Sequence, residues 1–267
     1  MTRYIVWAAS WLFILLVLVT PPAMVLTEAL KDGLAASVAT LSDPDAQAAI
    51  WLTLKVTCVA VTLNTIFGIL AAWVLVKFRF PGRQFLQVLV ELPLSISPVV
   101  SGLVWLLLFG AQGWFGPLLE QWNIHIAFAV PGIILATLFV TLPYVVRTVM
   151  PVMEVQGRDA EEAAVLAGAG FWQILWHVTL PGVRGALLSG VLLTTARALG
   201  EFGAVSVVSG HIPGETETMP LHIENLYNGY QSVAAFTMAA LLALMAMSAV
   251  LLRSAPDWIA RLQEKKA

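Results

Sequence analysis

The chain has 267 residues, of which 59% are hydrophobic and 11% charged, and its formal net charge at pH 7 is −2. Soluble globular domains are about 45–50% apolar and about 25% charged, so this chain, with a mean hydropathy of +0.86, has too few polar residues for a water-exposed surface. Its single cysteine, Cys58, excludes an internal disulfide and any multi-cysteine metal site. Most of the chain is therefore expected to face lipid.

A helix needs about 20 mostly apolar residues to cross a bilayer. Six stretches meet this requirement and predict an all-α protein with six transmembrane helices, at residues 5–26, 50–76, 85–109, 127–151, 185–208 and 232–253. No small-x-small cleavage site follows the first stretch, so we interpret it as a retained helix and not a secretory signal. Pro93 and Pro98 lie inside the third span and are expected to bend it.

Basic residues are distributed unevenly between the two sides of the predicted bundle. Only Lys31 lies on one side, while Lys55 and Arg197 lie inside predicted helices. The other eleven of the 14 lie on the side of both termini: Arg3, Lys77, Arg79, Arg83, Arg147, Arg158, Arg184, Arg253, Arg261, Lys265 and Lys266. The positive-inside rule then places both termini in the cytoplasm, in agreement with an even number of spans.

The loop between the fourth and fifth spans is a polar interruption on the cytoplasmic side. Residues 157–168 predict a short helix with Asp159, Glu161 and Glu162 in its first turn, where acids interact favourably with the helix dipole. Gly168 is expected to end this helix.

A second short helix is predicted directly after it. Apolar residues from Phe171 to Val178 recur at i, i+3, i+4 and i+7, which gives the helix one apolar face, and Leu180-Pro181 is expected to end it. The two helices would form an elbow on the cytoplasmic face. Periodicity alone fits an amphipathic interfacial loop equally well.

Arg197 and Glu201 lie near the middle of the fifth predicted span. Charges inside a bilayer are costly, so such residues face a partner or water. Together with Thr194 they would form one polar stripe on a helix. The stripe either lines a translocation path or subunit seam, where Arg197 would help an oxyanion to pass, or is a structural charge pair.

The fifth loop, residues 210–231, is external in this topology. Four of its residues are candidate contacts for a substrate-binding protein: His211, Glu215, Glu217 and His222. No HExxH run and no His pair at i, i+4 occurs, so we expect no metal site. A short helix is predicted from Met219 to Tyr227.

The fourth loop matches a known pattern. Glu162-Ala163-Ala164, then Gly168, then Val178 and Leu180-Pro181 resembles the EAA loop of ABC-importer permeases, where Ile is usual in place of Val178. In that family the loop sits in a cleft of the ATP-hydrolysing subunit and transmits its closure. The resemblance implies that an ATPase-coupling loop spans residues 154–183. Its candidate residues are Glu161, Glu162, Ala163, Ala164, Gly168, Leu180 and Pro181.

Residues 196–228 are similar to sulfate/thiosulfate transport permeases of the CysW type. Further matching stretches are residues 73–80, 92–100, 113–117, 131–137 and 156–157. The resemblance implies a type I ABC importer permease fold and a multi-pass protein of a bacterial-type inner membrane. Residues 50–253 would form the permease domain, after a first helix and external loop at residues 1–49 and before a cytoplasmic tail at residues 254–267.

The chain contains no G-x-x-x-x-G-K-[ST] sequence, so it does not bind ATP in the P-loop manner. We therefore expect a permease and not an enzyme, with no cofactor of its own and with ATP and Mg²⁺ on a partner ATPase. The resemblance implies a heterodimer with a homologous permease, two ABC ATPase subunits and an extracytoplasmic sulfate/thiosulfate-binding protein, and no nucleic acid.

Two other interpretations remain open from the sequence. A permease for another oxyanion, such as molybdate or tungstate, would share the coupling loop. A channel would need no such loop, and an intramembrane enzyme should show paired catalytic residues, of which Arg197 and Glu201 are the only candidates.

Overall fold

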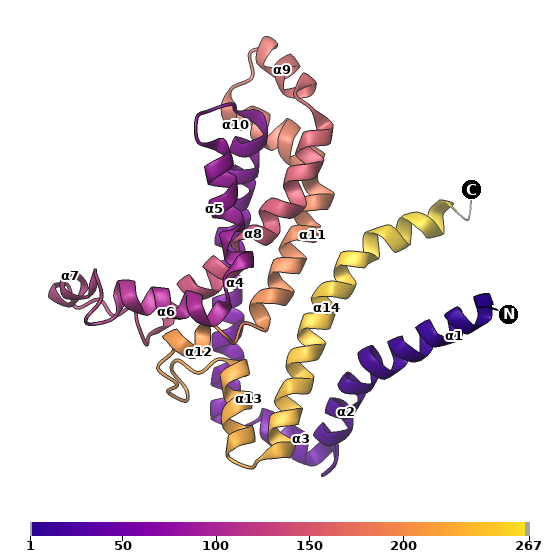
Figure 1. The fold of residues 1–267 in the computed structure, drawn as a ribbon, viewed down its shortest axis with the longest axis vertical. Coiled ribbons are helices and arrows are strands. Elements are labelled where there is room, and N and C mark those ends of the chain that lie inside the picture. The colour runs from indigo at the N-terminus through magenta and orange to yellow at the C-terminus, as the bar shows by residue number, and fades with distance from the viewer. Residues whose placement is uncertain (1, 265–267) are drawn as a thin grey trace. The chain divides into compact units, whose positions relative to one another are not determined.

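The computed structural model describes residues 2–264, and its regular elements in that range are all helices (Figure 1). Lys265 and Lys266 of the predicted tail, and the side chains of Arg253 and Arg261, lie outside what it describes. Five helical stretches are long and apolar enough to cross a membrane: Val6–Ala29, Pro44–Lys77, Val130–Gln156, Phe171–Leu199 and Ser232–Leu251. A bent pair, α5 (Arg83–Ser95) and α6 (Pro98–Phe109), makes a sixth if the two helices form one span. The all-α prediction is confirmed.

The chain forms two compact units, of which the first comprises residues 1–53 and 211–245. Its elements are α1 (Thr2–Ile14), a π-helical turn η1 (Leu15–Val19), α2 (Thr20–Ala29), α3 (Leu34–Leu41), the start of α4 (Pro44–Lys77), α13 (Met219–Asn228) and the start of α14 (Ser232–Glu264). The helix predicted from Met219 is confirmed as α13. α4 begins directly after Asp43, whose Oδ1 accepts a hydrogen bond from the Asp45 amide at 2.9 Å.

Hydrogen bonds to buried groups hold the first unit together. The Ala29 carbonyl at the end of α2 accepts from the hydroxyl of Ser37 in α3 at 2.8 Å and from that of Thr237 in α14 at 3.2 Å. The Met219 amide at the start of α13 donates to Oγ1 of Thr53 in α4 at 2.8 Å. A small apolar cluster that includes Ala46 and Met238 lies beside it.

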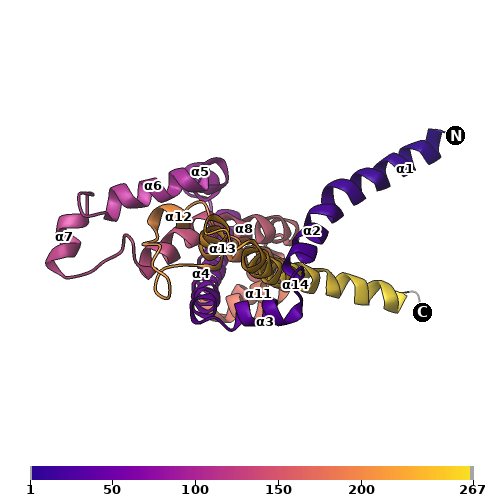
Figure 2. The ribbon, with the colours of Figure 1, turned by 90° about the horizontal axis from the view of Figure 1, so that it is seen from below.

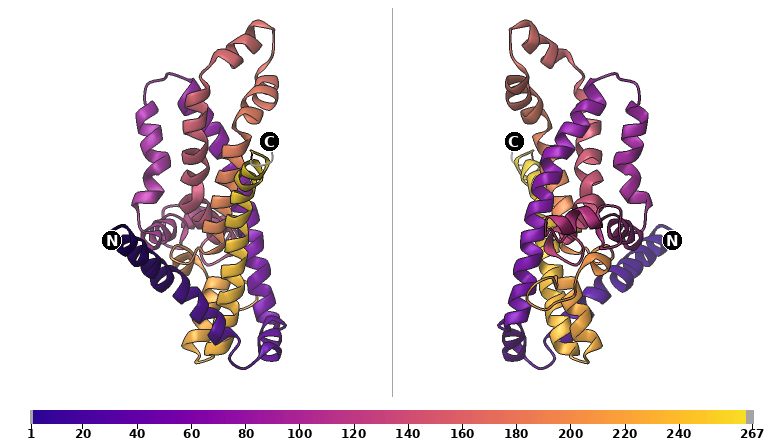
Figure 3. Two further views of the ribbon diagram at one scale, coloured as in Figure 1. Left: turned by 90° about the vertical axis from the view of Figure 1, so that its right-hand side faces the viewer. Right: turned by 90° about the vertical axis from the view of Figure 1, so that its left-hand side faces the viewer.

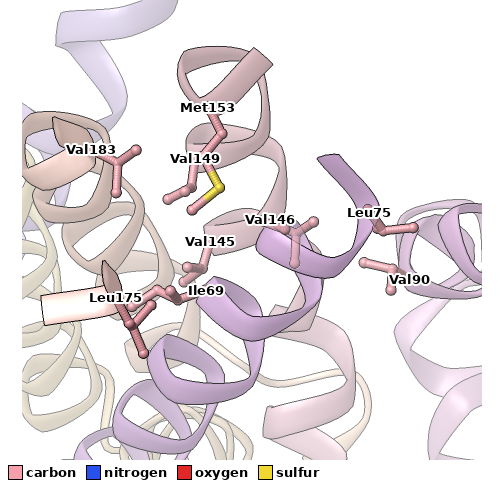
Figure 4. Packing of buried hydrophobic residues seen from close by; sticks show 10 residues of the cluster. Ile69, Leu75, Val90, Val145, Val146, Val149, Met153, Leu175 and Val183 are labelled. Carbon is pink, nitrogen blue, oxygen red and sulfur yellow. The ribbon is translucent and has the colours of Figure 1, made fainter. Parts of the chain in front are cut away.

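The second unit comprises residues 54–210 and 246–267, and α8 (Val130–Gln156) lies at its centre. Its core contains Val145, Val149 and Met153 of α8 with residues from α4, α5 and α11 (Figure 4). A Cβ at Gly68 of α4 would lie 2.8 Å from the Val145 Cβ, and one at Gly190 of α11 would lie 3.3 Å from the Val145 Cα. Small residues thus allow both helices to approach α8 closely, as is common between membrane helices.

The third predicted span is not one straight helix. α5 and α6 are bent by 112° at a break between Ser95 and Pro98, which fits a broken span or a re-entrant loop. Pro93 lies within α5, whereas Ile96 and Ser97 are extended, because the residues before Pro98 are biased away from helical conformation. α7 (Gly116–Gln121) follows α6. α12 (Val205–Val208) packs against α6 and α8 (Figure 2).

The fifth span, predicted at residues 185–208, is displaced toward the N-terminus. α10 (Phe171–Ile174), the π-helical turn η2 (Leu175–Thr179) and α11 (Leu180–Leu199) form one helical stretch (Figure 3). The prediction that Leu180-Pro181 ends a helix is therefore wrong. The Leu180 amide bonds the Leu175 carbonyl, and this wider turn accommodates a proline that would clash with a regular α-helical turn.

Candidate functional site

The loop between α8 and α10 contains a short helix, α9 (Asp159–Leu166), at one end of the second unit (Figures 1 and 3). Asp159, Glu161 and Glu162 lie in its first turn, as predicted. Gly157 before it has φ = 66° and Gly168 after it has φ = 84°, conformations that favour glycine. The loop is thus a helix that two glycines separate from the flanking elements.

One face of α9 is exposed and partly apolar. Leu166 is 89% and Val165 58% exposed, and Glu162 and Ala163 are exposed beside them. Ala164 is half-buried, and its carbonyl accepts from the Ala169 amide at 2.9 Å. Exposed aliphatic side chains on a polar loop are typical of surfaces that another protein covers.

The opposite face of α9 contacts the rest of the second unit through Glu161. Its Oε2 lies 3.3 Å from Nζ of Lys77, the last residue of α4, and its Oε1 accepts from Oγ1 of Thr179 at 2.7 Å. Lys77 also donates to the Gly157 carbonyl. The two adjacent acids of the predicted site thus have different surroundings, because Glu161 faces inward and Glu162 faces outward.

The remaining residues of the predicted coupling loop have different environments. Gly168 supplies the turn after α9. Leu180 packs against the core of the second unit, and Pro181 is exposed in the first turn of α11.

Arg197 and Glu201 form an ion pair, but not on one helix face. α11 ends at Leu199, so Glu201 lies in the turn that follows Gly200, and the predicted continuous stripe is wrong. The Arg197 Nη1 and Glu201 Oε2 are 2.6 Å apart, although this contact is not aligned as a hydrogen bond. Oε1 of Glu201 accepts from the Ala204 amide at 2.9 Å. The carboxylate thus binds the residue directly before α12 (Val205–Val208).

Exposure differs sharply across this group. The Glu201 side chain is 1% exposed and the Arg197 side chain 28% exposed, so the guanidinium reaches the surface from a buried carboxylate. Thr194 is fully buried one turn earlier, and its hydroxyl donates to the Gly190 carbonyl at 2.8 Å. The structure brings Arg197 and Glu201 together but uses the Thr194 hydroxyl within its own helix.

Two of the four residues predicted to contact a binding protein are buried. Glu217 is 2% and His222 8% exposed, and the His222 Nδ1 lies 3.2 Å from the Glu217 Oε2. Asn225 donates to the other oxygen of Glu217. Glu217 and His222 thus bond to neighbours within this chain, whereas His211 and Glu215 are exposed.

Within residues 2–264, no group of three or more His, Cys, Asp or Glu side chains is arranged to hold a metal ion. Sequence reasoning treated Lys77 as one of several cytoplasmic basic residues and missed its ion pair. A lysine at the end of an apolar stretch was the available sequence signal, but its partner lies far away in the chain.

A sequence profile described as "Binding-protein-dependent transport system inner membrane component" matches residues 64–266. The chain belongs to this family. Its members are permease subunits of ABC importers, so the chain is a transport component and not an enzyme.

Two relatives of the permease have a described transport system. The sulfate transport system permease protein CysW of Escherichia coli (strain K12) is 51% identical over 251 residues, which cover 94% of this chain and 86% of the relative. The sulfate transport system permease protein CysT of the same strain is 37% identical over 241 residues, 88% of this chain and 87% of the relative. The resemblance to permeases of the CysW type is thereby confirmed.

A solved structure shares the fold of the permease. One chain of a bacterial alginate ABC transporter, in complex with an alginate pentasaccharide-bound periplasmic protein, matches with a TM-score of 0.78. The match covers 95% of this chain and 92% of that chain at 18% identity. At this identity the match concerns the fold alone, and it confirms the type I ABC importer permease fold.

Proposed function

We propose that this permease moves sulfate or thiosulfate across a bacterial-type inner membrane as part of an ATP-driven importer. The observation that carries the proposal is the 51% identity over 94% of the chain to the sulfate permease of E. coli. Because the sequence has no P-loop, ATP and Mg²⁺ belong to partner subunits.

The proposed complex contains a second, homologous permease, two ABC ATPase subunits and an external sulfate/thiosulfate-binding protein. The chain is 51% identical to one E. coli sulfate permease and 37% to another, which supports pairing of two different but related chains. The exposed His211 and Glu215 are the proposed contacts for the binding protein, and the buried Glu217 and His222 support the loop that presents them.

α9 is the proposed contact with the ATPase. Its exposed face offers two aliphatic side chains beside Glu162 and the small Ala163, which suits a helix held closely in a cleft. The positive-inside rule places this loop and both termini in the cytoplasm, where the ATPase binds. Closure of the ATP-bound ATPases would draw the α9 helices of the two permeases together and open the path outward, and hydrolysis would reset it.

Arg197 is the proposed contact with the anion along the path or at the permease seam. Its guanidinium is partly exposed, while the buried Glu201 carboxylate neutralises part of its charge. Such a group can attract a doubly charged oxyanion without binding it so tightly that release becomes slow. We expect Arg197→Gln to reduce sulfate uptake at least about 10-fold. A charge-assisted hydrogen bond is stronger than a neutral one by about 1–1.5 kcal/mol, which corresponds to a factor of roughly 10. Full uptake by this variant would exclude the role.

The complete transporter, reconstituted in vesicles with its binding protein on the side from which sulfate is taken up, tests the function directly. We expect uptake of radiolabelled sulfate that requires ATP and that unlabelled thiosulfate inhibits. Uptake without ATP would contradict an ATP-driven importer. Inhibition by molybdate or tungstate, with none by thiosulfate, would instead assign the permease to those oxyanions.

A further inference from the structure

Lys77 is a charged residue in an unusual position. It is the last residue of α4, and its side chain is only 6% exposed. Its ammonium group lies 3.3 Å from the Glu161 Oε2 and donates to the Gly157 carbonyl. Both partners belong to the loop that holds α9, so α4 is joined to that loop through a nearly buried charge.

The carboxylate of Glu161 joins three separate elements. One oxygen faces Lys77 of α4, while the other accepts from the Thr179 hydroxyl in η2 at 2.7 Å. The Glu161 side chain is 16% exposed, so water competes little for either contact. α9 is therefore held against both α4 and η2 by a single side chain.

An aromatic contact reinforces the same connection one turn earlier on α4. Trp73 is four residues before Lys77 and so lies on the same helix face. Its ring packs edge-on against Phe171, the first residue of α10, with a centroid distance of 4.9 Å. Both ends of the loop thus meet one face of α4, through Glu161 at α9 and through Phe171 at α10.

The backbone connects α9 to α8 and α10 less rigidly than the ion pair connects it to α4. Gly157 and Gly168 flank the helix, both with positive φ, and glycine changes its backbone dihedrals at low cost. A displacement of α9 can therefore be absorbed at the glycines before it reaches α8 or α10 along the chain. Separating Lys77 from Glu161 would instead leave two uncompensated, nearly buried charges, so the ion pair resists that change.

We propose that Lys77 and Glu161 are positioning residues whose ion pair passes the displacement of α9 directly to α4. The inference rests on the proposed function, since it assumes that an ATPase moves α9. It separates the two glutamates of α9, because Glu162 contacts the ATPase and Glu161 carries the movement into the membrane domain. α4 then becomes a moving element of the transport cycle that the loop drives without a covalent link.

The complete transporter in vesicles, with binding protein and radiolabelled sulfate, provides the test. The variants are Lys77→Met, Glu161→Gln, Lys77→Arg and the charge exchange Lys77→Glu with Glu161→Lys. Asp159→Asn is the matched control, because Asp159 lies in the same turn of α9 but is exposed and makes no ion pair within the described residues. Sulfate uptake and ATP hydrolysis are measured on the same preparation, together with the ATPase retained on the purified permease.

We expect Lys77→Met and Glu161→Gln to lower the sulfate transported per ATP hydrolysed about 5-fold or more, the lower end of typical coupling between sites. ATPase retention and hydrolysis should stay close to the Asp159→Asn values. Lys77→Arg should keep most of the coupling, and the charge exchange should recover part of it. The milder Glu161→Gln keeps the test valid if Lys77→Met does not fold.

Two results would overturn the inference. Transport per ATP equal to that of Asp159→Asn in both single variants would show that the ion pair transmits nothing. A loss of ATPase retention in parallel with uptake would show that the pair only shapes the docking surface. If the unmodified permease shows no ATP-dependent uptake, the proposed function itself fails, and this outcome is distinct because it precedes any substitution.

Discussion

The loop that contains α9 and the loop that contains α13 have similar compositions but use their acids differently. Each has three or more carboxylates, several glycines and one short helix. In α9, Asp159 and Glu162 are exposed, and Glu161 alone turns inward. In the external loop, Glu217 is buried and bonded to His222 and Asn225. Acid content therefore predicts a polar loop, whereas burial decides whether a carboxylate binds a partner or supports the fold.

The largest expected effect follows from reversing a charge on the exposed face of α9. Glu162→Lys should weaken retention of the ATPase by about 100-fold, because a like or unpaired charge in an interface costs about 2–5 kcal/mol. The permease itself should keep its melting temperature, since Glu162 is exposed. Pull-down of the ATPase and a thermal melt of the purified permease measure the two quantities. Unchanged retention and uptake would contradict the role of α9.

Removal of the buried carboxylate in the loop that contains α13 should lower the stability of the permease and not its retention of the ATPase. Glu217→Leu leaves the ring of His222 and the amide of Asn225 without their partner, which should destabilise the permease by about 2 kcal/mol. ATPase retention should not change. The matched control is Glu215→Gln, which removes an exposed carboxylate two residues earlier and should change stability by less than about 0.5 kcal/mol. Equal melting temperatures for the two variants would show that the buried carboxylate of Glu217 does not support the fold.

A smaller effect is expected at the glycines that shape the loops. Gly168→Ala places a side chain at φ = 84° and should cost about 1–2 kcal/mol, although no atom lies within 4 Å of the new Cβ. Gly185→Ala is the matched control, because Gly185 lies inside α11 with equally open surroundings and helical backbone, so alanine should stabilise it by about 0.5–1 kcal/mol. Denaturation of both variants in the same detergent gives the comparison. A stabilising Gly168→Ala would show that the turn after α9 does not need this conformation.

Much of the fold follows from local properties of the sequence. Apolar stretches predicted where the spans lie, apart from the displaced fifth span, because a lipid-facing helix needs about 20 apolar residues whatever its neighbours are. The spacing of Asp159, Glu161 and Glu162 before Gly168 predicted α9, because helix starts and glycine turns depend on nearby residues. Hydropathy did not reveal the break between α5 and α6, since both halves are apolar, but Pro93 and Pro98 predicted a bend in this span.

Tertiary structure alone decided which glutamate of α9 meets a lysine. Glu161 and Glu162 are consecutive and chemically identical, yet about 100° of helix rotation separates their directions. One faces Lys77, which belongs to a helix far earlier in the chain, and the other faces away from the unit. Likewise, Glu201 lies beyond the end of the helix of Arg197, and its carboxylate bonds the Ala204 amide. The sequence by itself determined that α9 is an acidic helix between two glycines, and the packing of distant helices determined which of its acids is available to a partner.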